Sequence, residues 1–354
     1  MPATSSRCAL LTAPHTLRVV TRPQESLEPW QARVRVDLVG VCGTDRALVA
    51  GTLPAPLPLV PGHEFVGTVV EVARTEHEAW LGKRVCADIN NTCVSRGSTS
   101  PCRACRACRI GLVHHCQRRN VTGIFAAAGA FAEFVSVPVA NLFEVPEEID
   151  DRRAVFCEPL AAALQTFVQV PVGPGDVVAV LGPGRLGCLI AAVAHRQGAQ
   201  VLAVGRNRTK LRACAQLGVG EVVEAEVSKA GNPAVRDHID RLSEGLGADV
   251  VVEATGHPEG LAAAQTMVRP RGTIVLKTTC GLPPEGFDVT RAVVDEVSLV
   301  GSRCGPFAAA MTQLADPSLG VERLIEASYG LAEVSTAIAR AREVMKVVVN
   351  PQAP

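Results

Sequence analysis

A glycine-rich turn between an apolar strand and a helix is the feature that most constrains the fold of this 354-residue chain. The run Gly182-Pro183-Gly184-Arg185-Leu186-Gly187 follows the apolar stretch 177–181 and opens a helix predicted over 186–197. It matches the pattern G-x-G-x-x-G. The three glycines would make a tight turn, let the backbone approach a pyrophosphate, and let the helix pack on the strand. The turn therefore predicts a dinucleotide site at a helix N-terminus, with an ordinary strand-to-helix turn as the alternative.

The segments that follow alternate between strand and helix. A second helix is predicted over 208–217, and continuous apolar strands are predicted at 201–204, 248–253, 273–276 and 298–300. Strands that are apolar throughout, alternating with helices, are typical of a parallel, doubly wound sheet. We therefore predict an α/β protein in which residues 154–303 form a Rossmann dinucleotide-binding domain.

The first 150 residues have a different pattern, with short strands broken by glycine and proline turns. Strands are predicted at 32–38, 65–72, 83–87 and 132–137. This pattern indicates an irregular, β-rich domain over residues 1–153. Residues 304–354 are predicted to return to it, with helices over 307–316 and 331–343 and a final strand at 346–349.

Charge and hydropathy exclude several classes of protein. Lysine and arginine together number 35, as do aspartate and glutamate, so an excess of positive charge for nucleic acid or a membrane surface is absent. No apolar run approaches the roughly 18 residues that span a bilayer. Thirteen cysteines in a chain this long favour metal binding and buried thiols over disulfides. We expect a cytoplasmic protein that acts on a small molecule.

Four cysteines form the most specific metal motif, Cys102-x2-Cys105-x2-Cys108-x7-Cys116. Four thiolates close a tetrahedral shell around Zn²⁺ and leave no open position, so the predicted role is structural. Cys93, nine residues upstream, is an alternative ligand. The same four cysteines could instead hold an iron–sulfur cluster or remain unligated, buried thiols.

A second group of metal-binding side chains lies near turns elsewhere. The segments Cys42-Gly43-Thr44-Asp45 and Gly62-His63-Glu64 carry a thiol, an imidazole and two carboxylates, and Cys157-Glu158-Pro159 follows later. Three protein ligands and an exchangeable water are typical of catalytic zinc. These segments therefore predict a second, catalytic zinc ion.

Together these motifs resemble those of the zinc-dependent medium-chain alcohol dehydrogenase superfamily over essentially the whole chain. Glu158-Pro159-Leu160-Ala161 is similar to its branch of polyol, threonine and sugar dehydrogenases. The resemblance implies a GroES-like catalytic domain beside the Rossmann domain, in a homodimer or homotetramer. It implies hydride transfer between NAD(P)(H) and an alcohol or polyol, or the corresponding aldehyde or ketone. A zinc-bearing reductase of activated C=C bonds and a non-catalytic NADPH-binding protein are the two competing interpretations.

The resemblance also implies roles for single residues. Cys42 and His63 would be ligands of the catalytic zinc. Glu158 would supply the third ligand, directly or through water, with Cys157 as its competitor. Glu64 would be an alternate ligand when substrate is absent.

Two further residues would act beside these ligands. Asp45 would accept from the free ring nitrogen of His63 and fix its tautomer. Thr44 would begin the proton relay from the substrate hydroxyl. Residues 46–49 contain no histidine to pass the proton outward, so the rest of the relay stays open.

The residues after the second apolar strand bear on the choice of dinucleotide. NAD sites usually carry an acidic residue where Gly205 stands, and Arg206 and Arg208 follow it. A 2′-phosphate would meet no repulsion there and would pair with either arginine. The sequence therefore predicts that NADP is preferred, with NAD as the alternative; both arginines could instead be solvated residues at a helix start.

Overall fold

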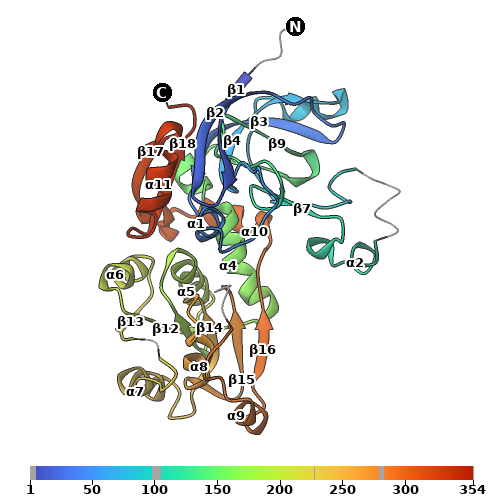
Figure 1. The fold of residues 1–354 in the computed structure, drawn as a ribbon. Coiled ribbons are helices and arrows are strands. Elements are labelled where there is room, and N and C mark those ends of the chain that lie inside the picture. Colours follow the sequence, from blue (N-terminus) through green and yellow to red (C-terminus); the bar gives the residue numbers. More distant parts are fainter. Residues whose placement is uncertain (1–4, 98–104, 227, 279–282, 354) are drawn as a thin grey trace. The chain divides into compact units, whose positions relative to one another are not determined.

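The computed structural model describes residues 5–97, 105–226, 228–278 and 283–353, and the chain divides into two compact units (Figure 1). Unit 1 comprises Met1–Glu158, Met311–Ala315 and Ile325–Pro354. Unit 2 comprises Pro159–Ala310 and Asp316–Leu324. The division falls inside two helices, α4 (Cys157–Gln169) and α10 (Phe307–Ala315).

Unit 1 is built on a seven-stranded mixed sheet with the order β10-β5-β4-β3-β18-β17, and β9 also pairs with β3. Its strands are β3 (Gln31–Gly40), β4 (Glu64–Val72), β5 (Arg84–Ala87), β9 (Phe134–Pro138), β10 (Leu142–Glu144), β17 (Ile325–Gly330) and β18 (Lys346–Asn350). Alternate residues of β3, such as Val34 and Val36, are fully buried in the core, as expected for a strand with period two. The β-rich character predicted for this part of the chain is confirmed.

Shorter elements complete unit 1. The strands β1 (Ser5–Ala13) and β2 (Thr16–Pro23) form an antiparallel hairpin, and a small sheet contains β6 (Asn90–Asn91), β7 (Asn120–Thr122) and β8 (Ala126–Ala127). The short helices are α1 (Gly43–Ala50), α2 (Arg106–Arg109), α3 (Asp151–Ala154) and α11 (Val334–Arg340), with 3-10 turns η1 (Thr75–Trp80), η3 (Val113–His115), η4 (Val139–Asn141) and η7 (Leu331–Glu333). Among the helices that the structure describes, none is long and apolar enough to cross a bilayer.

Unit 2 contains a six-stranded parallel sheet with the order β13-β12-β11-β14-β15-β16. Its strands are β11 (Val177–Leu181), β12 (Gln200–Gly205), β13 (Glu221–Glu224), β14 (Ala248–Glu253), β15 (Val268–Leu276) and β16 (Ser298–Gly301). Its helices are α5 (Arg185–Arg196), α6 (Arg208–Gln216), α7 (Pro233–Leu242), α8 (Gly260–Gln265) and α9 (Val289–Val294), with 3-10 turns η5 (Pro317–Leu319) and η6 (Val321–Leu324). The strand order reverses between β11 and β14, which confirms the predicted doubly wound sheet.

Asp316 fixes the start of η5. Its carboxylate accepts a hydrogen bond from the backbone N–H of Ser318 at 2.9 Å and forms an ion pair with Arg196 of α5. Hydrogen bonds from Ser318, together with Arg196, lower the pKa of Asp316 to about 2. An unfolded aspartate has a pKa of about 3.9, so the charged form stabilises the fold above about pH 4 and this contribution is lost as the pH falls towards 2.

We therefore expect Asp316→Asn to lower the midpoint of urea unfolding near neutral pH. The difference between the variant and the wild-type protein should shrink at about pH 3. At that pH, Asp316 of the unfolded wild-type chain is mostly protonated, so the folded state gains less from its charged carboxylate. Unfolding curves at the two pH values would check this. An equal difference at both pH values would show that the negative charge of Asp316 contributes nothing to stability.

Candidate metal and dinucleotide sites

Two turns of unit 1 bring the first candidate metal ligands together. Cys42 stands immediately before α1, and His63 immediately precedes β4. Because β3 and β4 are antiparallel neighbours, with Gly40 opposite Glu64, the end of one strand meets the start of the other. One ligand atom each from Cys42, His63 and Glu64 lie within 4.8 Å of one another. The carboxylate in this group therefore belongs to Glu64, which the sequence predicted as an alternate ligand.

Asp45 is fully buried and connects the two turns. Its Oδ2 accepts from the backbone N–H of Cys42 at 2.8 Å, and its Oδ1 accepts from that of Gly62 at 3.1 Å. The same Oδ1 lies 3.3 Å from Nδ1 of His63, although this buried nitrogen makes no well-aligned hydrogen bond. Since Nδ1 faces Asp45, Nε2 of His63 is the nitrogen available to a metal ion.

The electrostatics around His63 favour a cation. Burial opposes the charged imidazolium, yet Asp45 and Cys42 raise the pKa of His63 well above its ordinary value. A bound divalent cation would displace this proton, because an imidazole ligand must be neutral. Thiolate, imidazole and carboxylate are donors that Zn²⁺ accepts, so the residues present fit a zinc ion with an open coordination position. The Thr44 Oγ1 lies 3.7 Å from the Cys42 Sγ, beside this group.

Glu64 is held by a lysine that the sequence did not single out. Lys346, the first residue of β18, forms an ion pair with Glu64 Oε2, and the two side chains are 1% and 4% exposed. Its Nζ also lies 5.3 Å from the centre of the Phe156 ring. Gly40 provides the room, because a Cβ there would lie 2.4 Å from this Nζ. A lysine that begins an apolar strand looks like an ordinary exposed strand end, so no sequence signal could have found it.

Glu158 and Cys157, both at the start of α4, have different partners. Glu158 is partly exposed as a residue. Its pKa is raised to about 7, chiefly because the carboxyl group is buried; the negative charge of Glu64 adds to the rise, and the positive charges of His63 and Lys346 oppose it. The thiol of Cys157 is hydrogen-bonded with Cys86, which together with burial raises its pKa well above the usual range. The charge of Glu158 is thus coupled to the Cys42–His63–Glu64 group, whereas Cys157 is engaged with another cysteine.

The segment that carries the four-cysteine motif, residues 102–116, is called the cysteine lobe below. The structure describes it in part, because Cys102 lies outside the described residues. The sulfurs of Cys105, Cys108 and Cys116, which lie in and around α2 and η3, are all within 4.8 Å of one another. Burial raises the pKa of Cys116, but hydrogen bonds, first among them those of Cys93, lower it to about 6. The residues present therefore suit a metal ion that prefers thiolates.

The glycine turn has the shape that a dinucleotide requires. Gly182 has a φ of +87°, and a Cβ on Gly187 would lie 2.2 Å from the carbonyl oxygen of Gly182. Both positions therefore require glycine for packing. A Cβ on Gly184 would meet no atom within 4 Å, so this glycine, at the N-cap of α5, borders open space, as a backbone that a pyrophosphate approaches would. Arg185 and Leu186 begin the helix behind it.

The two glycines should respond differently to alanine. We expect Gly184→Ala to keep its melting temperature and to bind a dinucleotide at least tenfold more weakly, because the methyl group occupies the space of the phosphates. Gly187→Ala should destabilise the protein by about 1–3 kcal/mol through overpacking. Thermal unfolding and fluorescence titration with NADPH would measure both effects. Native affinity in Gly184→Ala would argue against a pyrophosphate at this turn.

The end of β12 bears on cofactor choice. A Cβ on Gly205 would lie 2.4 Å from Cδ of Pro183, so the glycine turn itself leaves no room for an acidic side chain there. Arg206 is exposed, and Arg208 Nε pairs with Glu224 Oε2 at 2.7 Å on the surface. Positive charge is therefore available beside Gly205, although that of Arg208 is shared with a carboxylate.

The sequence matches two family models, the alcohol dehydrogenase GroES-like domain over residues 28–147 and the zinc-binding dehydrogenase over residues 186–316. The L-threonine 3-dehydrogenase of Vibrio atlanticus is 31% identical, over 72% of this chain and 71% of its own length. The sorbitol dehydrogenase of Halalkalibacterium halodurans is 27% identical, over 94% of this chain and 95% of its own.

Solved structures agree with these matches. A zinc-binding dehydrogenase from Sinorhizobium meliloti, bound to NADP, is 28% identical with a TM-score of 0.83, covering 98% of this chain and 100% of its own. An alcohol dehydrogenase from Escherichia coli, in complex with NADH, is 25% identical with a TM-score of 0.86 over 98% of this chain and 99% of its own. The chain therefore belongs to the zinc-binding, medium-chain alcohol dehydrogenase superfamily and is an oxidoreductase.

Proposed function

We propose that this protein is a zinc-dependent dehydrogenase that transfers hydride between NADP(H) and an alcohol or polyol, or the corresponding aldehyde or ketone. The observation that carries the proposal is the Cys42–His63–Glu64 group, in which His63 and Glu64 are buried and Cys42 is partly exposed; its donors suit zinc and leave a coordination position for substrate. The similarity to dehydrogenases named for sorbitol and threonine supports substrates with more than one polar group.

Zinc would supply Lewis-acid chemistry at this site, lowering the pKa of a hydroxyl or polarising a carbonyl. Cys42 and His63 would hold the ion, and Glu158 would complete the ligand set when substrate is bound. Asp45 positions both ligand-bearing turns through its hydrogen bonds to the backbone. Thr44 would begin the proton relay: its Oγ1 would accept the substrate proton while its own hydroxyl proton passes onward to water, and the exchange would run backwards in the reverse direction.

Glu64 would be the alternate ligand of this ion. One of its two carboxylate oxygens, Oε2, is engaged by Lys346, so the other would be the one that binds the ion. Cys105, Cys108 and Cys116 would hold a second zinc ion with a structural role, together with Cys102, which lies outside the described residues.

NADP would be preferred over NAD. A Cβ on Gly205 would clash with Pro183, so the acidic residue that usually binds the ribose hydroxyls of NAD has no room at this position. Arg206 and Arg208 would supply positive charge to bind a 2′-phosphate. The NADP-bound relative supports this choice, while the NADH-bound relative keeps NAD as the alternative.

An absorbance screen of alcohols, polyols and carbonyl compounds, run with NADP(H) and NAD(H) side by side, tests the proposal. We expect turnover of a hydroxyl or carbonyl substrate and a higher kcat/KM with the phosphorylated cofactor. Product analysis with an enone would separate a carbonyl reductase from a reductase of activated C=C bonds. Reduction of the C=C bond alone, with no reaction of any alcohol or simple aldehyde, would overturn the proposal.

We also propose that unit 2 forms a homodimer or homotetramer through the β16 edge of its sheet. The edge strand β16 and the neighbouring α9 expose apolar side chains, Val289, Val293, Val294 and Leu299, between 46% and 75%. An open, apolar strand edge is a template for pairing with another chain. We expect Leu299→Arg to shift the mass measured by analytical ultracentrifugation towards the monomer. An unchanged oligomer would exclude this edge.

A further inference from the structure

A carboxylate lies one strand away from the place where NAD sites usually carry one. The strand β12 ends at Gly205, which has no side chain, and the parallel pairing of β12 with β13 places Glu224 directly opposite this glycine. The backbone N–H of Ala225 donates to the carbonyl oxygen of Gly205 at 3.0 Å, so the two strands stay together beyond this pair. Glu224 therefore belongs to the same edge of the sheet as Gly205.

Glu224 is paired with the first residue of α6. Arg208 Nε lies 2.7 Å from Glu224 Oε2, and the two side chains are 71% and 45% exposed. The start of α6 is fixed by Asn207, whose side chain accepts from the backbone N–H of Lys210 at 3.0 Å. The guanidinium of Arg208 is thus shared with a carboxylate of the neighbouring strand before any dinucleotide binds.

This ion pair lies at the adenosine end of the proposed dinucleotide site. A parallel, doubly wound sheet binds its ligand outside the carboxyl ends of its strands, where the strand order reverses. The glycine turn for the pyrophosphate follows β11, and β12 is the next strand of the same half of the sheet. The adenosine ribose would therefore lie at the end of β12, beside Gly205 and the ion pair of Arg208 with Glu224.

A 2′-phosphate and Glu224 would compete for Arg208. A phosphate monoester carries nearly two negative charges at neutral pH and binds a guanidinium strongly. If Arg208 turned to the phosphate, the carboxylate of Glu224 would remain close by and repel it. Arg206 is exposed and forms no ion pair with any residue that the structure describes, so its charge is the one ready for a phosphate. NAD, whose ribose carries only hydroxyl groups there, meets no such repulsion.

We propose that Glu224 is a determinant of cofactor choice that acts against NADP. It holds Arg208 in an ion pair and leaves Arg206 to bind the 2′-phosphate. The inference rests on the proposed dinucleotide site and its preference for NADP, which Glu224 limits and does not reverse. Glu224 is a positioning residue, because it acts through Arg208.

The test is a comparison of dissociation constants for NADPH and NADH, measured by fluorescence titration of full-length variants. The ratio of the NADH constant to the NADPH constant reports the contribution of the 2′-phosphate without any need for turnover. Glu224→Gln should raise this ratio about fivefold or more, because a repelling charge is lost and Arg208 is released. Arg206→Gln should lower the ratio at least tenfold.

Two further variants show whether the effect is specific. Glu221→Gln removes an equal charge from the other end of β13, where Glu221 Oε2 lies 3.2 Å from His238 Nδ1, and should leave the ratio within about twofold of native. Adding Arg208→Gln to Glu224→Gln should return the ratio to within about threefold of native, because the net charge beside the phosphate is then the native one.

The outcomes separate this inference from the proposed function. An unchanged ratio in Glu224→Gln, with the expected fall in Arg206→Gln, would overturn the role of Glu224 and leave the phosphate site intact. A gain in Glu224→Gln that survives the addition of Arg208→Gln would overturn the action through Arg208. A native ratio near one that Arg206→Gln does not change would overturn the proposed preference for NADP as well.

Discussion

Replacement of Cys42 by alanine is expected to lower kcat/KM by roughly a thousandfold or more. A Lewis acid supplies several kcal/mol of transition-state stabilisation, and each 1.36 kcal/mol corresponds to a factor of about ten. Without this thiolate, the Cys42–His63–Glu64 group loses one of its three close donors. The dissociation constant for NADPH should stay within about twofold, because the glycine turn lies in unit 2.

Steady-state kinetics with the best substrate of the screen and fluorescence titration with NADPH would measure the two quantities. Cys8→Ala is a suitable control, since Cys8 is a buried cysteine of the same unit that packs against Val60 and Ala132. It should leave both quantities near their native values. Turnover that survives in Cys42→Ala would remove the proposed mechanism.

Replacement of Lys346 by methionine is expected to destabilise the protein by roughly 3–5 kcal/mol. The substitution keeps an unbranched apolar stem but leaves the carboxylate of Glu64 buried without its partner, and an uncompensated buried charge costs about this much. Chemical denaturation of the native and variant proteins, in the presence of a chelator, would measure the difference.

A surface lysine provides the control. Lys83 pairs with Glu144 at 2.6 Å, but both side chains are at least 40% exposed, so Lys83→Met should change stability by no more than about 1 kcal/mol. Adding Glu64→Gln to Lys346→Met should recover part of the loss, because the buried charge is then absent. Equal effects of the two lysine substitutions would show that burial of the Glu64–Lys346 pair has no energetic consequence.

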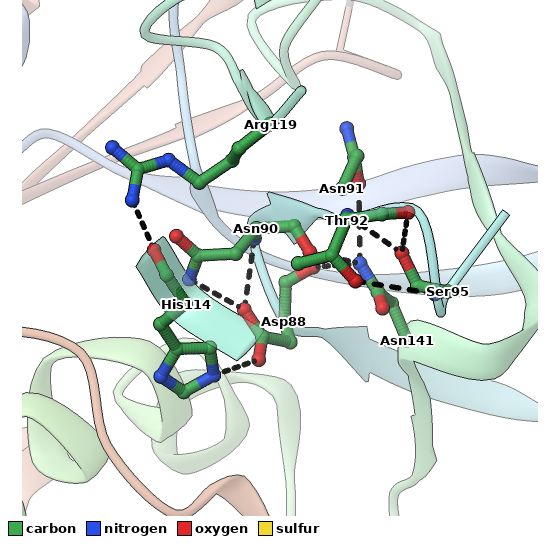
Figure 2. Close-up of polar contacts among 8 residues, drawn as sticks. All are labelled: Asp88, Asn90, Asn91, Thr92, Ser95, His114, Arg119 and Asn141. Carbon is green, nitrogen blue, oxygen red and sulfur yellow. Dashed lines mark hydrogen bonds and ion pairs between the residues drawn. The ribbon is translucent and has the colours of Figure 1, made fainter. Parts of the chain in front are cut away.

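The parallel sheet was predictable because its strands are buried on both faces. The predicted strand 177–181 coincides with β11 (Val177–Leu181), all five of whose residues are buried. By contrast, β6 (Asn90–Asn91) contains only polar residues and is recognisable only through its pairing with β7. Short, polar strands give no periodic signal, so the hydrogen-bonded network around Asp88 and Asn141 was missed (Figure 2).

Some residues of the candidate site could likewise be predicted from the sequence, and others could not. Cys42, His63 and Glu64 were predictable from motifs whose residue types suit a metal, and the structure brings them together. Lys346 was not predictable, because its contact with Glu64 depends on the pairing of β18 with β3, strands that are some three hundred residues apart in the sequence.

The zinc content of freshly purified, active enzyme tests the central claim most directly. Two ions per subunit are expected in the native protein, one at the Cys42–His63 site and one in the cysteine lobe, and Cys42→Ala should retain only the second. Elemental analysis beside an activity assay of the same sample would measure this. Fully active native protein with a single ion, bound by the lobe and unaffected by Cys42→Ala, would contradict the account.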